Sequence, residues 1–315
     1  MTSKYIAKRL LQLIPLLIAI TFVSYGMMRI AGSDVVEQKM LNTGGIVSQV
    51  EIDNARAELG LDKPFVTQYF VWLGNLLKGD MGTSYVSGKP VFETFVSKLP
   101  ATLLLTFVSI LLTVIVSIPL GIVSAVYQNK IWDYIIRFFS FVGNSLPNFF
   151  VALLLMYLLA IKLDLFPVIS TETSLESVAM PAITLAIAMS AKYLRQVRAT
   201  VLDEMNKEYV VGAKARGIKF SNTLWKSIMK ASLVTIITLL MLSVGSLLGG
   251  TAIVESIFMW DGVGKMAVDA INMRDYPIIQ AYVMWMAIIY VIANLLTDIT
   301  YRWLDPRIRL GGDAQ

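Results

Sequence analysis

Long uncharged windows alternate with short charged segments along this chain. Since a helix of roughly 20 apolar residues crosses a bilayer, each window is a candidate membrane span. The fourth window is the shortest and reaches spanning length only if its helix continues past Lys192, whose side chain can extend to the membrane interface. The pattern predicts an all-α membrane protein with six transmembrane helices, at Leu10–Met28, Leu99–Asn129, Phe138–Ile161, Ser177–Ala191, Ala231–Val254 and Tyr276–Thr297.

The composition supports this class and excludes several kinds of chemistry. Of the 315 residues 56% are hydrophobic and 16% are charged, whereas about 25% of a soluble protein is charged. The absence of Cys excludes disulfides and thiol catalysis, and the absence of His excludes imidazole ligands and histidine acid–base chemistry. No nucleophile–base pair stands out either. We therefore expect no catalytic residue and no metal site.

The first window has two interpretations. The basic residues Lys4, Lys8 and Arg9 before an apolar stretch are typical of a secretory signal. The stretch is longer than the usual 7–15 apolar residues of a signal, and no small-residue cleavage site follows before Arg29. We interpret it as a retained helix.

Basic residues concentrate on one side of the six-span arrangement. They flank the first span, follow the second, fill the loop after the fourth and return in the tail: Lys4, Lys8, Arg9, Lys130, Arg137, nine residues from Lys192 to Lys230, Arg302, Arg307 and Arg309. By the positive-inside rule this side is cytoplasmic, which places both termini there. We expect a multi-pass protein of a bacterial or archaeal cell (inner) membrane.

The loop lengths suggest a domain organisation. We expect an N-terminal tail and first span over 1–30, a small extracytoplasmic subdomain over 31–98, a transmembrane core over 99–302 and a cytoplasmic tail over 303–315. The core contains a cytoplasmic loop over 203–230. In that loop Asp203 and Glu204 suit a helix N-terminus, and Gly217 suits a left-handed helix end. A second short helix is expected over Asn222–Lys230.

Small residues in this loop, Gly212, Ala213 and Ala215, would allow another surface to approach the backbone closely. The loop could equally be an amphipathic helix lying on anionic lipid. Its residue pattern, Glu208-Tyr209-Val210-x-x-Ala213-x-Ala215-x-Gly217, resembles the "EAA" loop of ABC importer permeases. Further stretches resemble the B-type subunits of the branch that serves peptides, nickel and metal chelates: Leu59–Pro64, Asp80–Ser84, Leu99–Thr102, Gly249–Gly264, Arg274–Gln280 and Asp305–Arg307.

The resemblance implies the type I ABC importer permease fold, with a cytoplasmic EAA coupling helix that docks an ATPase. The implied partners are a second permease subunit, two cytoplasmic ABC ATPases, an extracytoplasmic solute-binding protein and the lipid membrane. No nucleic acid and no cofactor in this subunit are expected, since ATP and Mg would be bound by the ATPases. The docking residues implied are Glu208, Tyr209, Gly212, Ala213, Ala215 and Gly217. The family's proline near Val234-Thr235 is absent, and Asp261 replaces another proline.

The translocation pathway is less sharply indicated. Candidates are Asn144, Pro147, Asn148, Gly249, Gly250 and Glu255. A proline within a span is compatible with either a pathway or a kink. Gly245, Gly249 and Gly250 suit close helix packing, with gating as the alternative. Asp298 suits an ion pair with Arg302, with ion coupling as the alternative.

Three function hypotheses follow. The motifs favour ATP-driven import of nickel or a nickel or metal chelate, with import of di- or oligopeptides as the alternative. A different class, an ion-coupled secondary transporter, would require mid-membrane carboxylates or inverted repeats, and only Asp298 approaches this. Gly262-Val-Gly-Lys265 resembles the end of a phosphate-binding loop but lacks its first Gly and its Ser/Thr, so no ATPase site is expected here.

Overall fold

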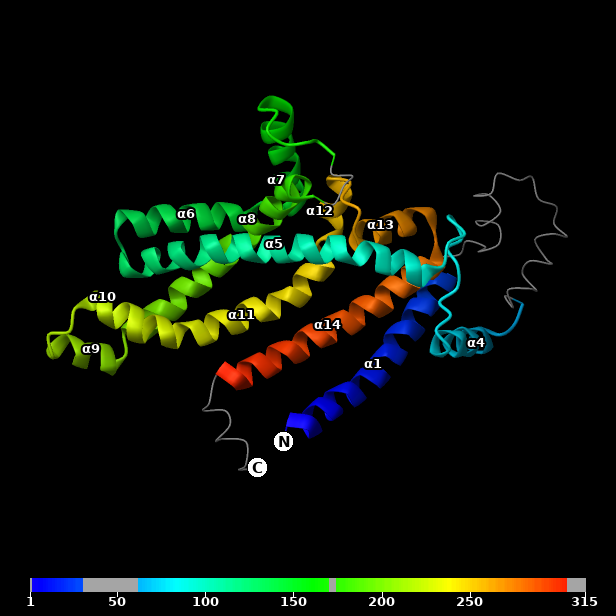
Figure 1. Cartoon of the computed structure of the whole chain (residues 1–315), viewed down its shortest axis with the longest axis horizontal. Coiled ribbons are helices and arrows are strands. Elements are labelled where there is room, and N and C mark those ends of the chain that lie inside the picture. Colours follow the sequence, from blue (N-terminus) through cyan, green and yellow to red (C-terminus); the bar gives the residue numbers. More distant parts are fainter. Residues whose placement is uncertain (1, 31–61, 170–173, 305–315) are drawn as a thin grey trace. The chain divides into compact units, whose positions relative to one another are not determined.

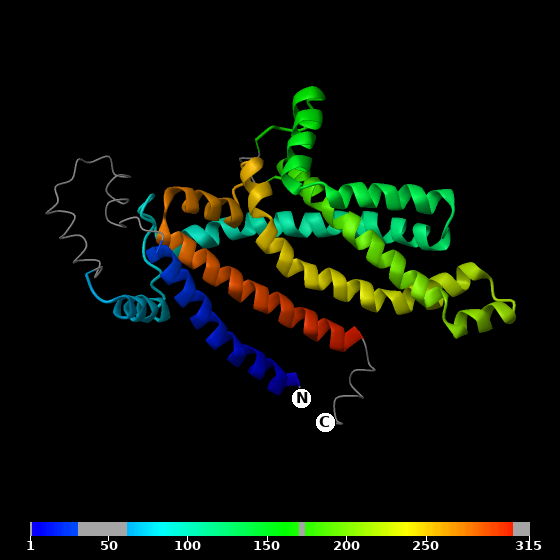
Figure 2. The same cartoon turned by 180° about the vertical axis from the view of Figure 1, so that it is seen from behind.

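The computed structural model describes residues 2–30, 62–169 and 174–304, with the side chains of 2–10, 29, 175, 242, 246, 248 and 301–304 outside that description. Within these ranges the chain is helical apart from turns and one isolated β-bridge between Thr83 and Pro90. Two compact units are present: one drawn from Met1–Ala101 and Gly262–Val291, the other from Thr102–Asp261 and Ile292–Gln315. Figures 1 and 2 show the helices from opposite sides.

The predicted all-α membrane fold is confirmed. Five helical stretches in the described ranges are long and apolar enough to span a bilayer: Leu11–Met28, Val91–Val126, Glu176–Met205, Phe220–Gly245 and Tyr276–Thr300. They lie in α1 (Thr2–Ile30), α5 (Val91–Val126), α8 (Leu175–Met205), the run from α10 to α11, and α14 (Tyr276–Leu304). The sixth candidate is a bent pair of helices.

The span predicted over Phe138–Ile161 is present as a bent pair of helices. Helix α6 (Ile131–Ser145) ends before Leu146, and α7 (Asn148–Leu155), extended by the π-helix η1 (Met156–Lys162), leaves at 103° to it. Pro147 causes the break, because a proline pushes the preceding residue out of the helical region and itself suits a helix start. Leu146 is accordingly extended (ψ 130°) and Pro147 caps α7.

The shortest predicted window lies in a long and well-buried helix. Helix α8 begins after Ser174, whose hydroxyl accepts from the Ser177 N–H at 3.1 Å, and it continues past Lys192 to Met205 as expected. Of its spanning window 61% is buried, the largest share among the five. Its modest hydropathy is therefore the signature of a helix packed among other helices.

The first unit joins α1 to α4 (Phe65–Leu77), the start of α5, α13 (Val263–Met273) and the start of α14. Its core consists of Val91, Phe95, Val263, Met266, Ala270, Ile278 and Ala281. The Ser84 hydroxyl donates to an Asp275 carboxylate oxygen, and the Tyr85 N–H donates to the other at 3.0 Å. These bonds fasten the 78–90 loop to the turn between α13 and α14. Burial and the nearby negative charge of Asp275 help to raise the pKa of Tyr85 to about 12.

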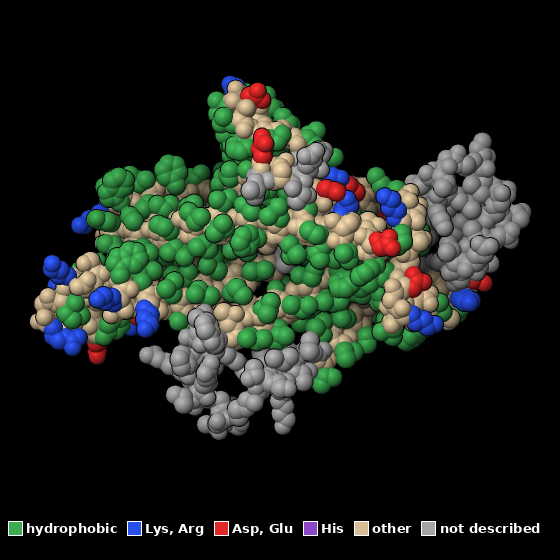
Figure 3. Space-filling model, in the orientation of Figure 1, with side chains coloured by type: hydrophobic (Ala, Val, Ile, Leu, Met, Phe, Trp, Pro, Cys, Tyr) green, Lys and Arg blue, Asp and Glu red, His purple; other side chains and the backbone are tan. Residues whose placement is uncertain are grey.

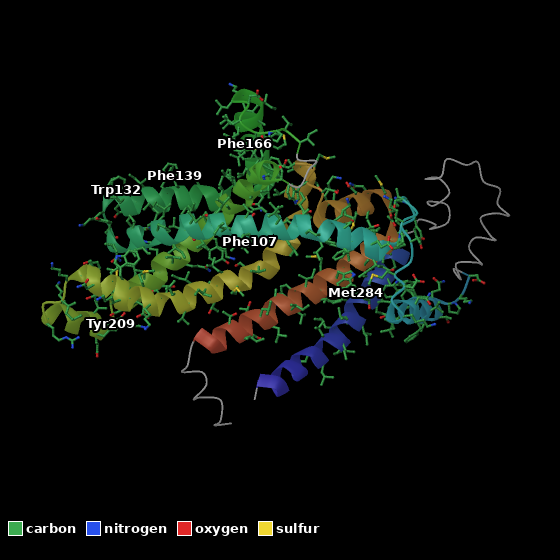
Figure 4. All side chains as sticks on the ribbon, in the orientation of Figure 1. Phe107, Trp132, Phe139, Phe166, Tyr209 and Met284 are labelled. Atoms are coloured by element: carbon green, nitrogen blue, oxygen red, sulfur yellow. The ribbon has the colours of Figure 1, made fainter. Side chains whose placement is uncertain are left out.

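The second unit is organised around α8, which packs against α6, α7, α11 (Met229–Gly250) and α12 (Ala252–Ile257). One face of α5 is lined by small hydroxyl side chains that are buried, and such residues allow close helix packing in membranes. They are Thr102, Thr106, Ser109, Thr113, Ser117 and Ser124. Large apolar side chains lie on the outside. Phe107, Trp132 and Phe139, labelled in Figure 4, are 65%, 57% and 66% exposed.

Candidate functional site

The loop between the spanning helices α8 and α11 contains the short helix α9 (Glu208–Ala215). The backbone of Lys207 is extended and starts the helix, and Glu208 lies in its first turn, where negative charge meets the positive end of the helix dipole. The expectation that Asp203 and Glu204 begin this helix is wrong. Both belong to the last turn of α8, which runs on to Met205.

The end of α9 is as predicted. Gly217 has φ +74°, the left-handed conformation that glycine adopts without a steric penalty. Its N–H donates to the Lys214 carbonyl at 3.0 Å, and the Ile218 N–H donates to the Ala213 carbonyl at 3.1 Å. This pair of bonds is the Schellman motif, which satisfies the last carbonyls of a helix. Helix α9 is therefore a rigid element despite its length.

The second expected helix is longer than predicted. Helix α10 (Phe220–Thr223) starts two residues before Asn222 and continues through the π-helix η2 (Leu224–Ile228) directly into α11. No break separates the loop from the spanning helix. A displacement of α9 would therefore reach α11 through a continuous helical segment.

Helix α9 has an anchored side and an open side. Val210 packs against a core cluster of the second unit, and Ala213 is only 6% exposed. The expectation that Ala213 offers close approach to a partner is therefore wrong, because its methyl group faces inward. Glu208, Tyr209, Ala215 and Gly217 are exposed, Gly212 is partly so, and a Cβ added at Gly212 or Gly217 would meet nothing within 4 Å.

The open side is both apolar and basic. Its exposed apolar residues are Tyr209, Val211, Ile218 and Phe220, at 39–64% exposure. The exposed basic residues around them are Lys207, Lys214, Arg216, Lys219 and Lys226. Figure 3 shows Lys and Arg gathered at the end of the second unit that carries α9, and Figure 4 marks Tyr209 there.

Glu204 fixes the angle at which α9 leaves α8. Its carboxylate accepts from the Tyr209 hydroxyl at 3.0 Å and pairs with the Lys207 ammonium group. Burial, and secondarily the hydrogen bond to Glu204, raise the pKa of Tyr209 to about 12. This contact was missed because Glu204 was assigned to the wrong helix.

A buried ion pair lies at the base of α8 and was also missed. Arg198 Nε and Nη2 donate to Asp133 Oδ1 and Oδ2, both at 2.8 Å. Asp133 is 0% exposed and also accepts from the Ser124 hydroxyl at 2.6 Å and the Asn129 N–H at 3.0 Å. The pair joins α6 and the end of α5 to α8. The available signal was an acidic residue in the first turn of an apolar helix.

The candidate pathway residues occupy different environments. Asn144 is exposed and accepts from Arg195 Nη2 at 3.2 Å, Pro147 is exposed at the bend, and Asn148 is half-buried at the start of α7. The kink predicted at Pro147 is present. A position of Pro147 in the pathway stays a prediction. The Arg302 side chain lies outside the described residues, so the Asp298–Arg302 pair stays a prediction.

Glu255 is enclosed rather than on an open surface. It is 0% exposed, and its Oε1 accepts from the hydroxyls of Thr102 and Thr251, each at 2.9 Å. Gly249 and Gly250, one turn earlier, are exposed, and a Cβ at either would meet nothing within 4 Å. The expectation that they pack closely is therefore wrong within this chain. The close helix packing occurs instead at Gly121, where a Cβ would lie 2.7 Å from Val197.

The model of the family described as "Binding-protein-dependent transport system inner membrane component" matches residues 117–310, and its N-terminal companion matches residues 2–106. The chain belongs to this family. It is an ABC importer permease of the peptide/nickel type, and the resemblance seen in the sequence is confirmed.

Characterised relatives match the permease over nearly its whole length. The oligopeptide transport system permease AppB of Bacillus subtilis is 38% identical over 97% of this chain and 99% of its own. The glutathione transport system permease GsiC of Pectobacterium atrosepticum is 35% identical over 97% and 98%. The metal-staphylopine import system permease CntB of Staphylococcus aureus is 33% identical over 98% and 99%.

Solved structures share the fold of the permease. A chain of the MetNI methionine ABC transporter in inward-facing conformation has a TM-score of 0.58 at 14% identity, over 67% of this chain and 96% of that one. A chain of an amino acid ABC transporter has a TM-score of 0.52 at 19% identity, over 67% and 94%. The type I importer permease fold is thereby confirmed.

Proposed function

We propose that this permease forms half of a translocation pathway and that α9 is its coupling helix. The second half would come from another permease subunit. Two cytoplasmic ABC ATPases would bind below, and a solute-binding protein would deliver the substrate outside. The observation that carries the proposal is α9 itself: a capped helix anchored on one side and open on the other, between two membrane-spanning helices.

The contacts of α9 suit it to transmit a displacement. Val210 packs on a cluster built from α5, α8, η2 and α11, and Glu204 and Tyr209 tie α9 to the end of α8. Packed interfaces switch between discrete arrangements rather than deform continuously. Pressure on the open side of α9 would therefore move α8 and α11 together. The exposed apolar residues Val211, Ile218 and Phe220 suit a groove on an ATPase.

Energy would come from the partners, with ATP and Mg on the ATPases. In this chain Gly262 and Gly264 are buried at the start of α13, on the short segment that resembles a phosphate loop. That segment lacks the residues that bind phosphate and Mg. We expect the purified permease alone to hydrolyse no ATP.

The substrate class is peptides or metal chelates. The three relatives named above carry an oligopeptide, glutathione and a metal–staphylopine complex according to their names, so the preference for nickel gains no specific support. We favour a short peptide, because the relative with the highest identity of the three is an oligopeptide permease. Calorimetry on the cognate solute-binding protein, with a set of peptides and a nickel chelate, separates these candidates.

The decisive experiment compares two glycine variants in the assembled importer. Gly217→Val forces a branched side chain into a left-handed position on α9. Gly88→Val creates the same backbone conflict (φ +69°) in the 78–90 loop, where a Cβ also meets nothing within 4 Å. We expect Gly217→Val to lower copurification of the ATPases and substrate uptake, while Gly88→Val retains copurification.

Cross-linking adds a direct readout. Because the chain contains no Cys, Val211→Cys introduces a single thiol on the open side of α9. It should cross-link to an ATPase subunit. Normal copurification of Gly217→Val together with no cross-link from residue 211 would show that α9 lies on lipid and is not the docking site.

A further inference from the structure

Helix α4 carries no charged residue, and its outer half is uncovered by the rest of the first unit. Its sequence, FVTQYFVWLGNLL, is flanked by Lys63 and Lys78. Val66, Phe70 and Leu77 are 52%, 63% and 82% exposed. A helix with this much open apolar surface on a water-exposed loop would be an aggregation site, so its open side requires a partner.

Hydrogen bonds between α4 and α1 define the depth of α4 relative to the apolar window of α1. The Tyr69 hydroxyl donates to the Ile18 carbonyl at 3.2 Å and lies 3.0 Å from the Thr21 hydroxyl. Thr21 precedes Met28, the end of the apolar window of α1, by seven residues, which is about 10 Å along a helix. A tyrosine side chain is shorter than this distance. The backbone of α4 therefore lies below the end of the apolar window.

Aromatic contacts support the same placement. The ring of Tyr69 packs edge-on against Phe22 at 5.1 Å between centroids, and Trp72 lies 5.9 Å from Tyr25. Figure 1 shows α4 beside the C-terminal part of α1. Tyr and Trp are enriched where a membrane protein crosses from acyl chains to headgroups.

The two edges of the open side differ in polarity. At 100° per residue, Val66, Phe70 and Leu77 fall on one edge, next to Tyr69, which reaches toward Ile18 in the middle of α1. The opposite edge carries Asn75 and the 53% exposed Val71 beside Gln68, whose side chain contacts Tyr25 nearer the end of α1. The apolar edge therefore faces the bilayer centre, and the polar edge faces the headgroups.

We propose that α4 is an interfacial helix sunk into the membrane, with Val66, Phe70 and Leu77 among acyl chains and Asn75 among headgroups. Its apolar edge continues an exposed apolar side of α1, where Ile14, Ile18 and Phe22 are 55%, 46% and 43% exposed. Helices with an apolar face and a polar face lie in the plane of the interface in this way, and in α4 the polar face consists of uncharged side chains. Such a helix would fix the 62–90 segment to the membrane surface. In the proposed topology α4 lies in the outer leaflet. Its immersion in the membrane does not depend on which leaflet this is.

Spin labels test the immersion, since the chain has no native Cys. The variants Phe70→Cys and Asn75→Cys place labels on the two edges of one helix. Ile14→Cys, on an exposed residue within the apolar window of α1, is the lipid reference, and Lys89→Cys, on an exposed loop residue, is the water-facing reference. The assembled importer is reconstituted in phosphatidylethanolamine/phosphatidylglycerol vesicles. Accessibility to oxygen, which partitions into lipid, is compared with accessibility to a water-soluble nickel complex.

We expect the label at residue 70 to give an oxygen-to-nickel ratio close to that at residue 14 and several-fold above that at residue 89. The label at residue 75 should fall between them. A ratio at 70 equal to that at 89 would place the helix in water. Protection of 70 from both reagents would show that a protein, such as the second permease, covers it. Either result overturns the proposal, and Val66→Cys repeats the test on the same edge.

Discussion

Arg198 and Asp133 are 65 residues apart in the chain and meet as a two-pronged ion pair, with both nitrogen–oxygen distances at 2.8 Å. The aspartate side chain is 0% exposed and the arginine side chain 18%. Asp133 also receives bonds from Ser124 and Asn129, so its carboxylate binds the end of α5, the following turn and the start of α6 to α8. Hydrogen bonds and an ion pair therefore hold α8, the helix that leads to the α9 loop, against α5 and α6.

Removing the arginine should destabilise the permease strongly. Arg198→Met leaves the Asp133 carboxylate buried without its cation, which costs about 3–5 kcal/mol. Arg198→Lys should recover only part of this, because an ammonium group cannot form the two parallel bonds. The measurement is the thermal unfolding midpoint in detergent. Arg195→Met is the control, since Arg195 is exposed and bonds to exposed Asn144. Equal midpoints for Arg198→Met and Arg195→Met would contradict the assignment.

The second prediction concerns Ser84 and Asp275, which fasten the 78–90 loop to the turn before α14. Asp275 is 3% exposed, and its carboxylate accepts hydrogen bonds from the Ser84 hydroxyl and the Tyr85 N–H. Asp275→Asn removes the negative charge of this acceptor. The cost of weakening such bonds is about 1–3 kcal/mol. We expect amide hydrogen exchange over residues 84–88 to become roughly tenfold faster or more, since about 1.4 kcal/mol is a factor of ten.

The control for this variant is Asp269→Asn on α13. Asp269 is 43% exposed and pairs with Lys265 one turn earlier, an arrangement that contributes about 0.3–0.5 kcal/mol. In Asp269→Asn, amide hydrogen exchange over residues 84–88 should be the same as in the unmodified protein. Similar exchange in both variants would mean that Asp275 does not hold the loop.

The third prediction tests the close approach of α5 and α8 at Gly121. A Cβ at this position would lie 2.7 Å from Val197 Cβ and 3.1 Å from the Leu194 carbonyl oxygen. Gly121→Ala should therefore destabilise the permease by about 1–3 kcal/mol, as overpacking does. Adding Val197→Ala should restore part of the loss. Gly249→Ala, where the new methyl group meets nothing within 4 Å, should not lower the midpoint, and a loss as large as that of Gly121→Ala would contradict the packing.

The fourth prediction concerns orientation, which rests on the distribution of Lys and Arg. Reporters fused after Lys230 or after Gln315 should be cytoplasmic, and a reporter inserted within Thr43–Gln49 should be external. Alkaline phosphatase and green fluorescent protein fusions give opposite signals in the two compartments. With a cytoplasmic N-terminus, an external C-terminus would require an odd number of spans. An external reporter after Lys230 would remove α9 from the reach of cytoplasmic ATPases.

The sequence alone determined the places of the apolar segments, though not the break within the third, and the turn that ends α9. Both depend on local physics: a stretch of some 20 uncharged residues cannot remain in water, and only glycine adopts φ near +74° without strain. The continuation of α8 past Lys192 followed from the same reasoning, because a lysine at the interface does not end a helix. The family motifs were read correctly from the order of the residues along the chain.

Tertiary structure decided what lies next to what. Pro147 marked the position of the break, but the direction in which α7 leaves α6, at 103°, is the one in which α7 packs against α8 and α12. Val210 and Ala213 lie on the anchored side of α9, which packs against the second unit. A pattern of small residues in the sequence does not show which side of a helix will be covered in this way. The pairs Arg198–Asp133 and Ser84–Asp275 join residues 65 and 191 positions apart. Buried charges must find partners wherever the fold brings them, and no local preference of either segment specifies that meeting.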